Sequence, residues 1–187
     1  MKTYPKKKLE GKKIYLEPFT NSHVSNKYLN WMKDRQITRF IQRSSNNITL
    51  EDLYTFANFM IKSDCDYFFA IIEKNEQLHI GNVRLGPINF KLGKSNFGIL
   101  IGDKNFHGLG IAQEALELLK DFGFNFLKLK KIQIYCVKEN NAAMRIYEKS
   151  KCEYKGEVKE TFDKDGKSYK LVEWIMDNLE FKSNNND

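Results

Sequence analysis

Residues 102–112 read Gly102-Asp103-Lys104-Asn105-Phe106-His107-Gly108-Leu109-Gly110-Ile111-Ala112. They follow a strand-like apolar segment and precede a long amphipathic segment with helical spacing. The first amide groups of a helix lack partners within it and lie at the positive end of its dipole. Glycines let a ligand approach the backbone closely. The stretch therefore predicts a phosphate- or pyrophosphate-binding loop at the start of a helix.

Two common nucleotide-binding motifs do not fit this loop. It has no Gly-Lys-Ser/Thr sequence, which excludes the P-loop pattern. It also lacks the third glycine of the dinucleotide fingerprint, and the strand before it belongs to an expected antiparallel meander. The loop alone therefore indicates anion binding and no particular nucleotide.

The pattern around the loop predicts the fold. Period-two and apolar runs predict strands over residues 14–18, 67–73, 78–90, 96–101, 132–137, 153–162 and 169–177. Helices are expected from Thr20 or Ser22 to Lys33, after the capping signal Thr49–Asp52, over residues 111–126, and from Asn140 or Asn141 to Lys149. The strand–helix–strand segment around residues 111–126 predicts one parallel strand pair. Together these elements indicate an α/β (α+β) protein with a mixed, mostly antiparallel central sheet of six to seven strands flanked by about four helices.

Composition indicates one globular domain. The chain has 187 residues, of which 41% are hydrophobic and 29% charged, with a net charge of +7. We expect a flexible basic leader over 1–12, a single domain over 13–178 and a polar tail over 179–187. No apolar run is long enough to span a bilayer, and no secretion signal follows the N-terminus. We therefore expect a cytoplasmic protein with no membrane partner.

The charge and the cysteines argue against other classes. Residues 1–13 hold six lysines and one glutamate, so most of the excess charge lies in the leader and we expect no nucleic-acid partner. The cysteines Cys65, Cys136 and Cys152 are odd in number and widely spaced, which argues against disulfides and zinc. With three histidines and no ligand spacing, no metal site is expected.

Two motifs in order carry a resemblance. The loop is similar to the pyrophosphate loop of the GNAT superfamily of acyl-CoA N-acyltransferases, Arg/Gln-x-x-Gly-x-Gly/Ala, where Gly110 and Ala112 match and His107 departs from the first position. Residues 137–149 resemble the family segment Asn-x-x-Ser/Ala-x-x-x-Tyr-x-Lys through Asn140, Ala143, Tyr147 and Lys149. The family usually continues with Gly-Phe, where this chain has Lys151-Cys152. The resemblance covers about residues 12–177, including the last hairpin, and is nearest to ribosomal-protein N-terminal (alanine/serine) acetyltransferases and related amino-sugar acetyltransferases.

The resemblance implies an acetyl-CoA-dependent N-acetyltransferase with a GNAT-type fold. Acetyl-CoA is the co-substrate, and the expected cofactor-binding residues are His107, Gly108, Leu109, Gly110, Ile111, Ala112, Asn140 and Ala143. Backbone groups of Ile99, Leu100 and Ile101 would contact the pantetheine and the oxyanion, although their side chains also suit a core. Tyr147 matches the usual general acid, with a packing tyrosine as the alternative, and Asn140 is also a favoured helix cap.

The general base does not follow from the sequence. The candidates are Glu17, Asp34, Asp103 and Glu160, each of which also reads as a surface charge, together with His79, His107 and a chain of waters. No Cys–His pairing is visible, so we expect direct transfer without an acetyl-cysteine intermediate.

The acceptor is a primary amine whose identity stays open. The segment 28–34 resembles the first helix of this branch, so Tyr28, Trp31 and Glu17 are expected to form the acceptor pocket, with core packing as the alternative for the two aromatic residues. Amino sugars and protein N-termini both remain candidates. The alternatives to an enzyme are a non-catalytic acyl-CoA-binding regulatory domain and a basic RNA- or ribosome-associated protein. A homodimer also stays open.

Overall fold

The computed structural model describes Tyr4 and residues 8–41, 47–162, 166–179 and 181. In this part of the chain eight strands form one sheet in the order β1-β2-β3-β4-β5-β6-β8-β7. The strands are β1 Leu9–Glu10, β2 Ile14–Pro18, β3 Tyr67–Glu73, β4 Leu78–Leu85, β5 Lys94–Ile101, β6 Lys131–Val137, β7 Glu153–Phe162 and β8 Ser168–Asp177. The expected mixed sheet is confirmed, with one strand more than the six to seven predicted.

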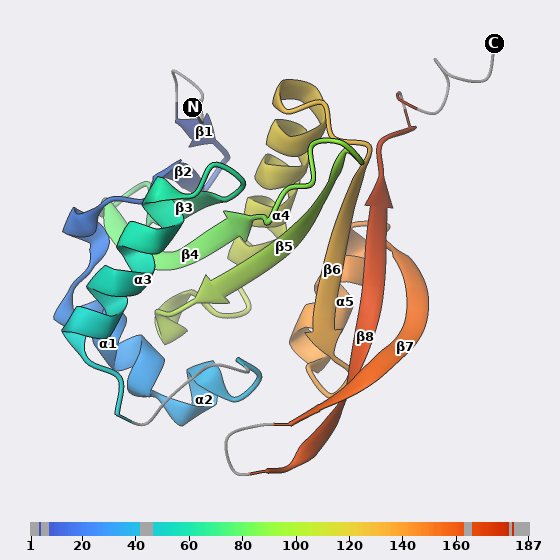
Figure 1. Ribbon diagram of the computed structural model, residues 1–187. Coiled ribbons are helices and arrows are strands. Elements are labelled where there is room, and N and C mark those ends of the chain that lie inside the picture. Colours follow the sequence, from blue (N-terminus) through green and yellow to red (C-terminus); the bar gives the residue numbers. More distant parts are fainter. Residues whose placement is uncertain (1–3, 5–7, 42–46, 163–165, 180, 182–187) are drawn as a thin grey trace.

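The described residues also contain five α-helices, where the sequence indicated about four. They are α1 Asn26–Lys33, α2 Arg35–Thr38, α3 Leu50–Lys62, α4 Ile111–Asp121 and α5 Asn141–Lys149. Figure 1 shows α1 to α3 gathered beside β3 and β4, with α4 and α5 on the other face of the sheet. The helix predicted to run from 111 to 126 ends at Asp121 and continues as a wider π-turn over Phe122–Phe126.

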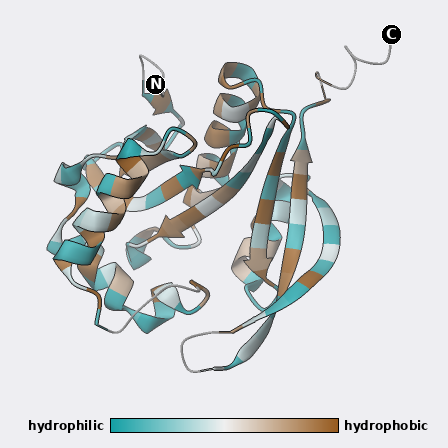
Figure 2. Cartoon of the chain, viewed as in Figure 1, coloured by the Kyte–Doolittle hydropathy of each residue, from teal (hydrophilic) through white to brown (hydrophobic). Residues whose placement is uncertain are grey.

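Strand pairing follows the predicted topology. β3, β4 and β5 pair antiparallel, as short turns require, and β5 pairs parallel with β6 across the α4 connection. The strand expected over 78–90, with an interruption near Gly86-Pro87, ends at Leu85, directly before that interruption. Along β6 hydrophobic and hydrophilic residues alternate, which suits a strand with one covered face (Figure 2).

The core has two parts because both faces of the sheet are covered. One cluster lies under α4 and α5 and includes Phe69, Leu116 and Ile134. The other lies under α1 and α3 and includes Trp31 and Phe68. Consecutive residues Phe68 and Phe69 belong to different clusters, as the alternation of side chains along a strand requires.

Local capping signals are mostly confirmed. Thr49 and Asp52 form the predicted capping box at the start of α3, with Asp52 N–H donating to Thr49 Oγ1 at 3.2 Å. The first helix begins later than predicted: Ser25 caps α1, and Thr20 instead caps a single 3₁₀ turn over Asn21–His23. That turn ends at Val24 in extended conformation, so it cannot continue into α1.

The N-terminal segment adds the extra strand. Leu9 and Glu10 pair with Leu16 and Tyr15, and the Tyr4 ring packs edge-on against Tyr67. Leu9 and Glu10 of the expected leader therefore pair within the sheet. The remaining leader residues 1–3 and 5–7, the turn residues 163–165, and 180 and 182–187 of the predicted tail lie outside the described residues.

Strands β5 and β6 separate along their length. Their pairing runs from Lys94↔Lys131 to Phe97↔Ile134 and stops there, although β5 continues to Ile101 and β6 to Val137. Figure 1 shows the two strands diverging toward the lower part of the view. The sheet is therefore open between residues 98–101 and 135–137, beside the start of α4.

Candidate active site

The predicted phosphate loop has an open backbone. Gly108 and Gly110 have φ values of 75° and 82°, in the left-handed region that favours glycine, and Gly110 caps α4. An added Cβ on either glycine would meet nothing within 4 Å. Leu109 between them is half exposed, whereas Ile111 is buried and fixes the helix start. The free amide groups of the first turn of α4 are thus accessible to an anion.

Two side chains attach this loop to the sheet. His107 Nε2 lies 2.9 Å from the carbonyl oxygen of Ile101 and donates to it, because a carbonyl can only accept. Lys13 Nζ donates to the Leu109 carbonyl at 2.7 Å. His107 therefore holds the loop against the last residue of β5, which is a definite role at the position where it departs from the family pattern.

The open end of β5 offers main-chain groups. Ile99, Leu100 and Ile101 pair with β4 only, opposite Val83, Asn82 and Gly81. Their side chains are partly buried and pack against the two core clusters, so the core interpretation is also correct for them. The backbone edge that faces β6 has no strand partner there, which leaves main-chain donors and acceptors for a ligand.

Helix α5 lies beside this opening and carries the second motif. The Asn140 side chain accepts from Ala143 N–H at 3.2 Å, so Asn140 is the helix cap. Tyr147 is 5% exposed and its ring centroid lies 6.1 Å from that of Trp174. Burial raises the pKa of Tyr147 well above its ordinary value, with smaller contributions from Cys136 and Cys152. The phenol therefore keeps its proton across the physiological pH range and has an O–H that can donate a hydrogen bond.

The two buried cysteines are poor nucleophiles. Burial raises the pKa of both Cys136 and Cys152 to about 11, although the polar Trp174 indole lowers that of Cys136 in part. The thiolate is the reactive form, so both thiols are inert at neutral pH. This supports the expectation of direct transfer.

The expected acceptor residues Tyr28 and Trp31 are buried in the second core, at 4% and 5% exposure. Trp31 packs on Gly102, where an added Cβ would lie 2.0 Å from the indole. Burial raises the pKa of Tyr28 to about 12, and the Asn82 side chain offsets part of this. Both aromatic residues thus pack the core and support the end of β5.

Glu17 forms an ion pair with Lys8 at 3.0 Å and a hydrogen bond with His23 at 3.0 Å. Burial raises the pKa of Glu17, but His23 and Lys8 outweigh it and bring the pKa below its ordinary value. The carboxylate therefore stays charged and occupied.

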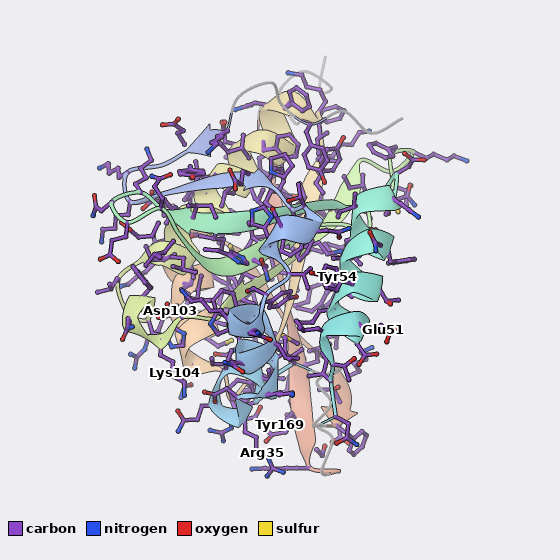
Figure 3. All side chains as sticks on the ribbon, turned by 90° about the vertical axis from the view of Figure 1, so that its left-hand side faces the viewer. Arg35, Glu51, Tyr54, Asp103, Lys104 and Tyr169 are labelled. Carbon is purple, nitrogen blue, oxygen red and sulfur yellow. The ribbon has the colours of Figure 1, made fainter. Side chains whose placement is uncertain are left out.

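Of the remaining candidates for the general base, Asp34 and Asp103 are held in ion pairs, and Glu160 is exposed to solvent. Asp34 pairs with Lys104 at 2.5 Å and caps α2, and Asp103 pairs with Lys27 at 2.8 Å. These two ion pairs connect α1 and α2 to the loop, and Figure 3 shows Asp103 and Lys104 on the side of α1 away from Glu51 and Tyr54 of α3. Glu160 is exposed on β7.

His79 is the second residue of β4 and follows directly on the turn over residues 74–77. Its Nε2 donates to Asn82 Oδ1 at 2.8 Å. Burial lowers the pKa of His79 to about 4, although this hydrogen bond raises it in part. His79 is therefore neutral at pH 7, and its Nε2 is already engaged with Asn82, so the structure gives it a packing and hydrogen-bonding role.

The sequence interpretation missed a polar group beside the opening between β5 and β6. Glu173 of β8 accepts hydrogen bonds from Gln133 Nε2 at 2.6 Å and Tyr135 Oη at 3.0 Å, both on β6. A signal existed, since Glu173 is a lone carboxylate inside the apolar run 171–176. Its position beside the diverging strands required the structure.

Other site types are not found in the described ranges. They contain no group of three or more His, Cys, Asp or Glu side chains suited to a metal ion. None of the helices in those ranges is both long enough and apolar enough to cross a bilayer.

Comparison with known proteins decides the family. The model of the acetyltransferase (GNAT) domain matches residues 13–153. The chain belongs to the GNAT acetyltransferases. Human alpha/beta-tubulin-N-acetyltransferase 9 is 26% identical over 152 residues, which cover 75% of this chain and 72% of that protein.

Solved GNAT structures share the fold. Spermidine N-acetyltransferase from Vibrio cholerae, in complex with CoA and spermine, has a TM-score of 0.81 at 20% identity and covers 91% of this chain and 98% of that one. A "putative ribosomal-protein-serine acetyltransferase" from Vibrio cholerae has a TM-score of 0.74 at 15% identity, covering 94% and 100%. The predicted GNAT recognition and fold class are confirmed.

This GNAT protein is an N-acetyltransferase with acetyl-CoA as co-substrate, as the sequence predicted. The residues present fit that molecule: the left-handed glycines with free space above them suit its phosphates, and the unpaired edge of β5 suits its amide-containing arm. Acetyl-CoA supplies an activated acetyl thioester for transfer to an amine.

Proposed function

We propose that this enzyme transfers acetyl directly to a primary amine that enters the opening between β5 and β6, with Tyr147 donating to the departing sulfur. The observation that carries the proposal is the end of β5–β6 pairing at Phe97↔Ile134. Beyond it, the backbone edge of Ile99–Ile101 that faces β6 has no strand partner, although the Ile101 carbonyl accepts from His107. A main-chain N–H on this edge is the proposed donor to the acetyl oxygen, and α5 carries Tyr147. Residues 107–112, Asn140 and Ala143 are the proposed cofactor contacts.

The chain's own groups supply the remaining requirements. A preorganised N–H can stabilise a developing oxyanion by several kcal/mol. Tyr147 holds its proton firmly, so it acts first as a donor of a hydrogen bond to the sulfur. The buried cysteines are protonated at neutral pH, which supports a single transfer step with no acetyl-enzyme.

Two classes of acceptor amine are candidates, small molecules and protein N-termini. One relative is named for tubulin, one similar structure for a ribosomal protein serine and another holds spermine. The described part of the opening carries Glu173 as a carboxylate without an ion-pair partner, which suits a single ammonium group better than a polyamine. We therefore propose a substrate with one primary amine at the reacting end, whether a small molecule or a protein N-terminus.

The deciding experiment is thiol release from acetyl-CoA with a panel of amines. The panel contains an amino sugar, spermine, an N-terminal tubulin peptide and an N-terminal serine peptide of a ribosomal protein. Saturable release with one member, and acetylated product by mass spectrometry, is the expected result. Binding of acetyl-CoA with no release for any amine would contradict it and favour the non-catalytic binding domain. The cytoplasmic location and the homodimer remain predictions.

A further inference from the structure

The residues just beyond the last β5–β6 pair form a polar surface, the polar floor, which consists of Gly98, Tyr135 and Glu173. Phe97, Ile134 and Trp174 lie side by side across three strands and point into the core under α4 and α5. Side chains alternate along each strand, so the next residues, Gly98, Tyr135 and Glu173, face the opposite way. That side is the one on which α1 and α3 cover β3 and β4.

There is free space above this floor. Gly98 is exposed, and a Cβ built on it would have no neighbour within 4 Å. Tyr135 is 39% exposed. Toward the paired end of the strands, Asn96 and Gln133 border a hollow of about 240 Å³, lined also by Pro87, Asn89, Leu92, Lys94 and Ser95. An amine with an attached chain has room to lie along these residues.

The Glu173 carboxylate is held in place but not neutralised. Its Oε1 accepts from Gln133 Nε2 and from Tyr135 Oη, and Gln133 Nε2 also lies 3.1 Å from Tyr135 Oη. Within the described ranges it forms no ion pair with lysine or arginine, and no hydrogen bond reaches its Oε2. This differs from Glu17, Asp34 and Asp103, which each have a lysine partner.

A charged oxygen of this kind suits an ammonium group. A partly buried carboxylate gains from an opposite charge, because the local dielectric is lower than in water. The two neutral donors on Oε1 orient the carboxylate, which leaves Oε2 for an incoming N–H. Glu173 pairs with Tyr135 of β6, the strand that faces the backbone edge of β5 proposed for the acetyl oxygen.

We propose that Glu173, oriented by Tyr135 and Gln133, binds the ammonium group of the acceptor and takes its proton. This inference rests on the proposed function, since it assigns the acceptor side of the same opening. In the balanced step, the ammonium N–H bond breaks and its proton goes to Glu173 Oε2. The nitrogen lone pair then forms the bond to the acetyl carbon, the carbon–sulfur bond breaks, and the nitrogen releases its second proton to solvent to give a neutral amide. Sulfur leaves with the electron pair of the broken bond and takes a proton from Tyr147, which solvent reprotonates, or from solvent directly. Glu173 returns its proton to solvent.

The first test measures binding without turnover. The CoA-loaded enzyme is titrated with n-butylammonium, and the side-chain amide of Gln133 is followed by NMR because it contacts Glu173 directly. We expect a saturable shift in the wild type that is lost in Glu173→Gln. It should remain in Glu76→Gln, a matched change at an exposed glutamate in the β3–β4 turn. No shift in the wild type, or an equal shift in Glu173→Gln, overturns the proposal.

The second test separates proton transfer from binding. With the alkylamine acceptor found in the panel, Glu173→Gln should lower kcat/KM about a hundredfold. With methoxyamine, which is already neutral at pH 7 and needs no base to free its lone pair, the loss should be less than about threefold. Equal losses for both amines would overturn the proton-accepting role. Tyr135→Phe, which keeps the carboxylate, should lose less than Glu173→Gln with the alkylamine, and an equal or larger loss would contradict the assignment to the carboxylate.

The outcomes also separate this inference from the proposed function. A wild type that releases no thiol with any amine contradicts the function, while the NMR titration still decides the ammonium site. A wild type that is active and unaffected by Glu173→Gln contradicts the inference alone.

Discussion

His107 Nε2 donates a hydrogen bond to the main-chain carbonyl of Ile101 at 2.9 Å, which connects the phosphate loop to the end of β5. The loop would bind the phosphates, and the end of β5 is the strand proposed to contact the reacting acetyl group. One side chain therefore sets the position of two cofactor-binding segments relative to each other. The family pattern has arginine or glutamine here, so this chain uses a different side chain for a comparable position.

Replacing His107 should weaken cofactor binding. His107→Phe removes the donor to Ile101, and one such hydrogen bond contributes about 1 kcal/mol, so we expect roughly fivefold weaker binding of CoA by calorimetry. Asn105→Ala, in the same loop, is the control and should bind CoA as the wild type does. Unchanged affinity in His107→Phe would show that the loop holds its position without this bond.

Tyr147→Phe should lower turnover about tenfold to a hundredfold while CoA affinity stays the same. The hydroxyl is the group proposed to donate to sulfur, whereas the buried ring remains to pack against Trp174. Steady-state kcat and calorimetric titration with CoA measure the two quantities. Turnover equal to the wild type at every pH tested would remove Tyr147 from the mechanism and leave it a packing residue.

The buried cysteines should be dispensable for chemistry. Because the pKa of Cys136 and of Cys152 is about 11, both thiols remain protonated at pH 7 to 9 and the reactive thiolate forms only as pH rises toward 11. Iodoacetamide at pH 8 should therefore label the partly exposed Cys65 first. Cys136→Ala and Cys152→Ala should each retain turnover, and an acetylated cysteine trapped during the reaction would contradict direct transfer.

Asn140→Ala should destabilise the fold by about 1 kcal/mol through loss of the cap on α5. Urea unfolding measures the change, and Asn141→Ala at the next position is the matched control. Asn140→Ser should recover most of the loss, since serine also caps helices. If Asn140→Ala weakens CoA binding without a change in stability, then its main role is contact with the cofactor.

Gly102→Ala should destabilise the protein by about 1–3 kcal/mol, because the added Cβ would lie 2.0 Å from the Trp31 indole. Gly98→Ala adds the same group where no atom lies within 4 Å, so its unfolding free energy should stay within about 0.5 kcal/mol of the wild type. Thermal or urea unfolding compares the pair. Equal stability of the two variants would mean that Trp31 moves away easily from the end of β5.

Local features of the chain were predictable from the sequence. Thr49 with Asp52, and Asn140 before α5, are capping signals that act within a few residues, and both are found where expected. The meander of β3 to β5 followed from short turns, and the parallel β5–β6 pair followed from the helical connection between them. Where two potential capping residues lie close together, as Thr20 and Ser25 do, the sequence does not determine at which of them the helix begins.

Long-range relationships needed the tertiary structure. Glu173 and Tyr135 are 38 residues apart and meet only because β8 pairs with β6 in one register. The pairing of Asp34 with Lys104, and of Asp103 with Lys27, likewise depends on how α1 and α2 lie against the loop. Without those contacts, the candidates for the base were equivalent surface charges.

The sequence by itself determined the fold class, the anion-binding start of α4 and the family, because glycines, caps and residue spacing act through local backbone geometry. The tertiary structure decided what the site contains. It buried Tyr28 and Trp31 as packing residues and gave His107 a bond to Ile101. It also placed Glu173 beside the opening between β5 and β6, with no ion-pair partner among the described residues. Burial and electrostatic partners arise from segments far apart in the chain, so they exist only once the strands have paired.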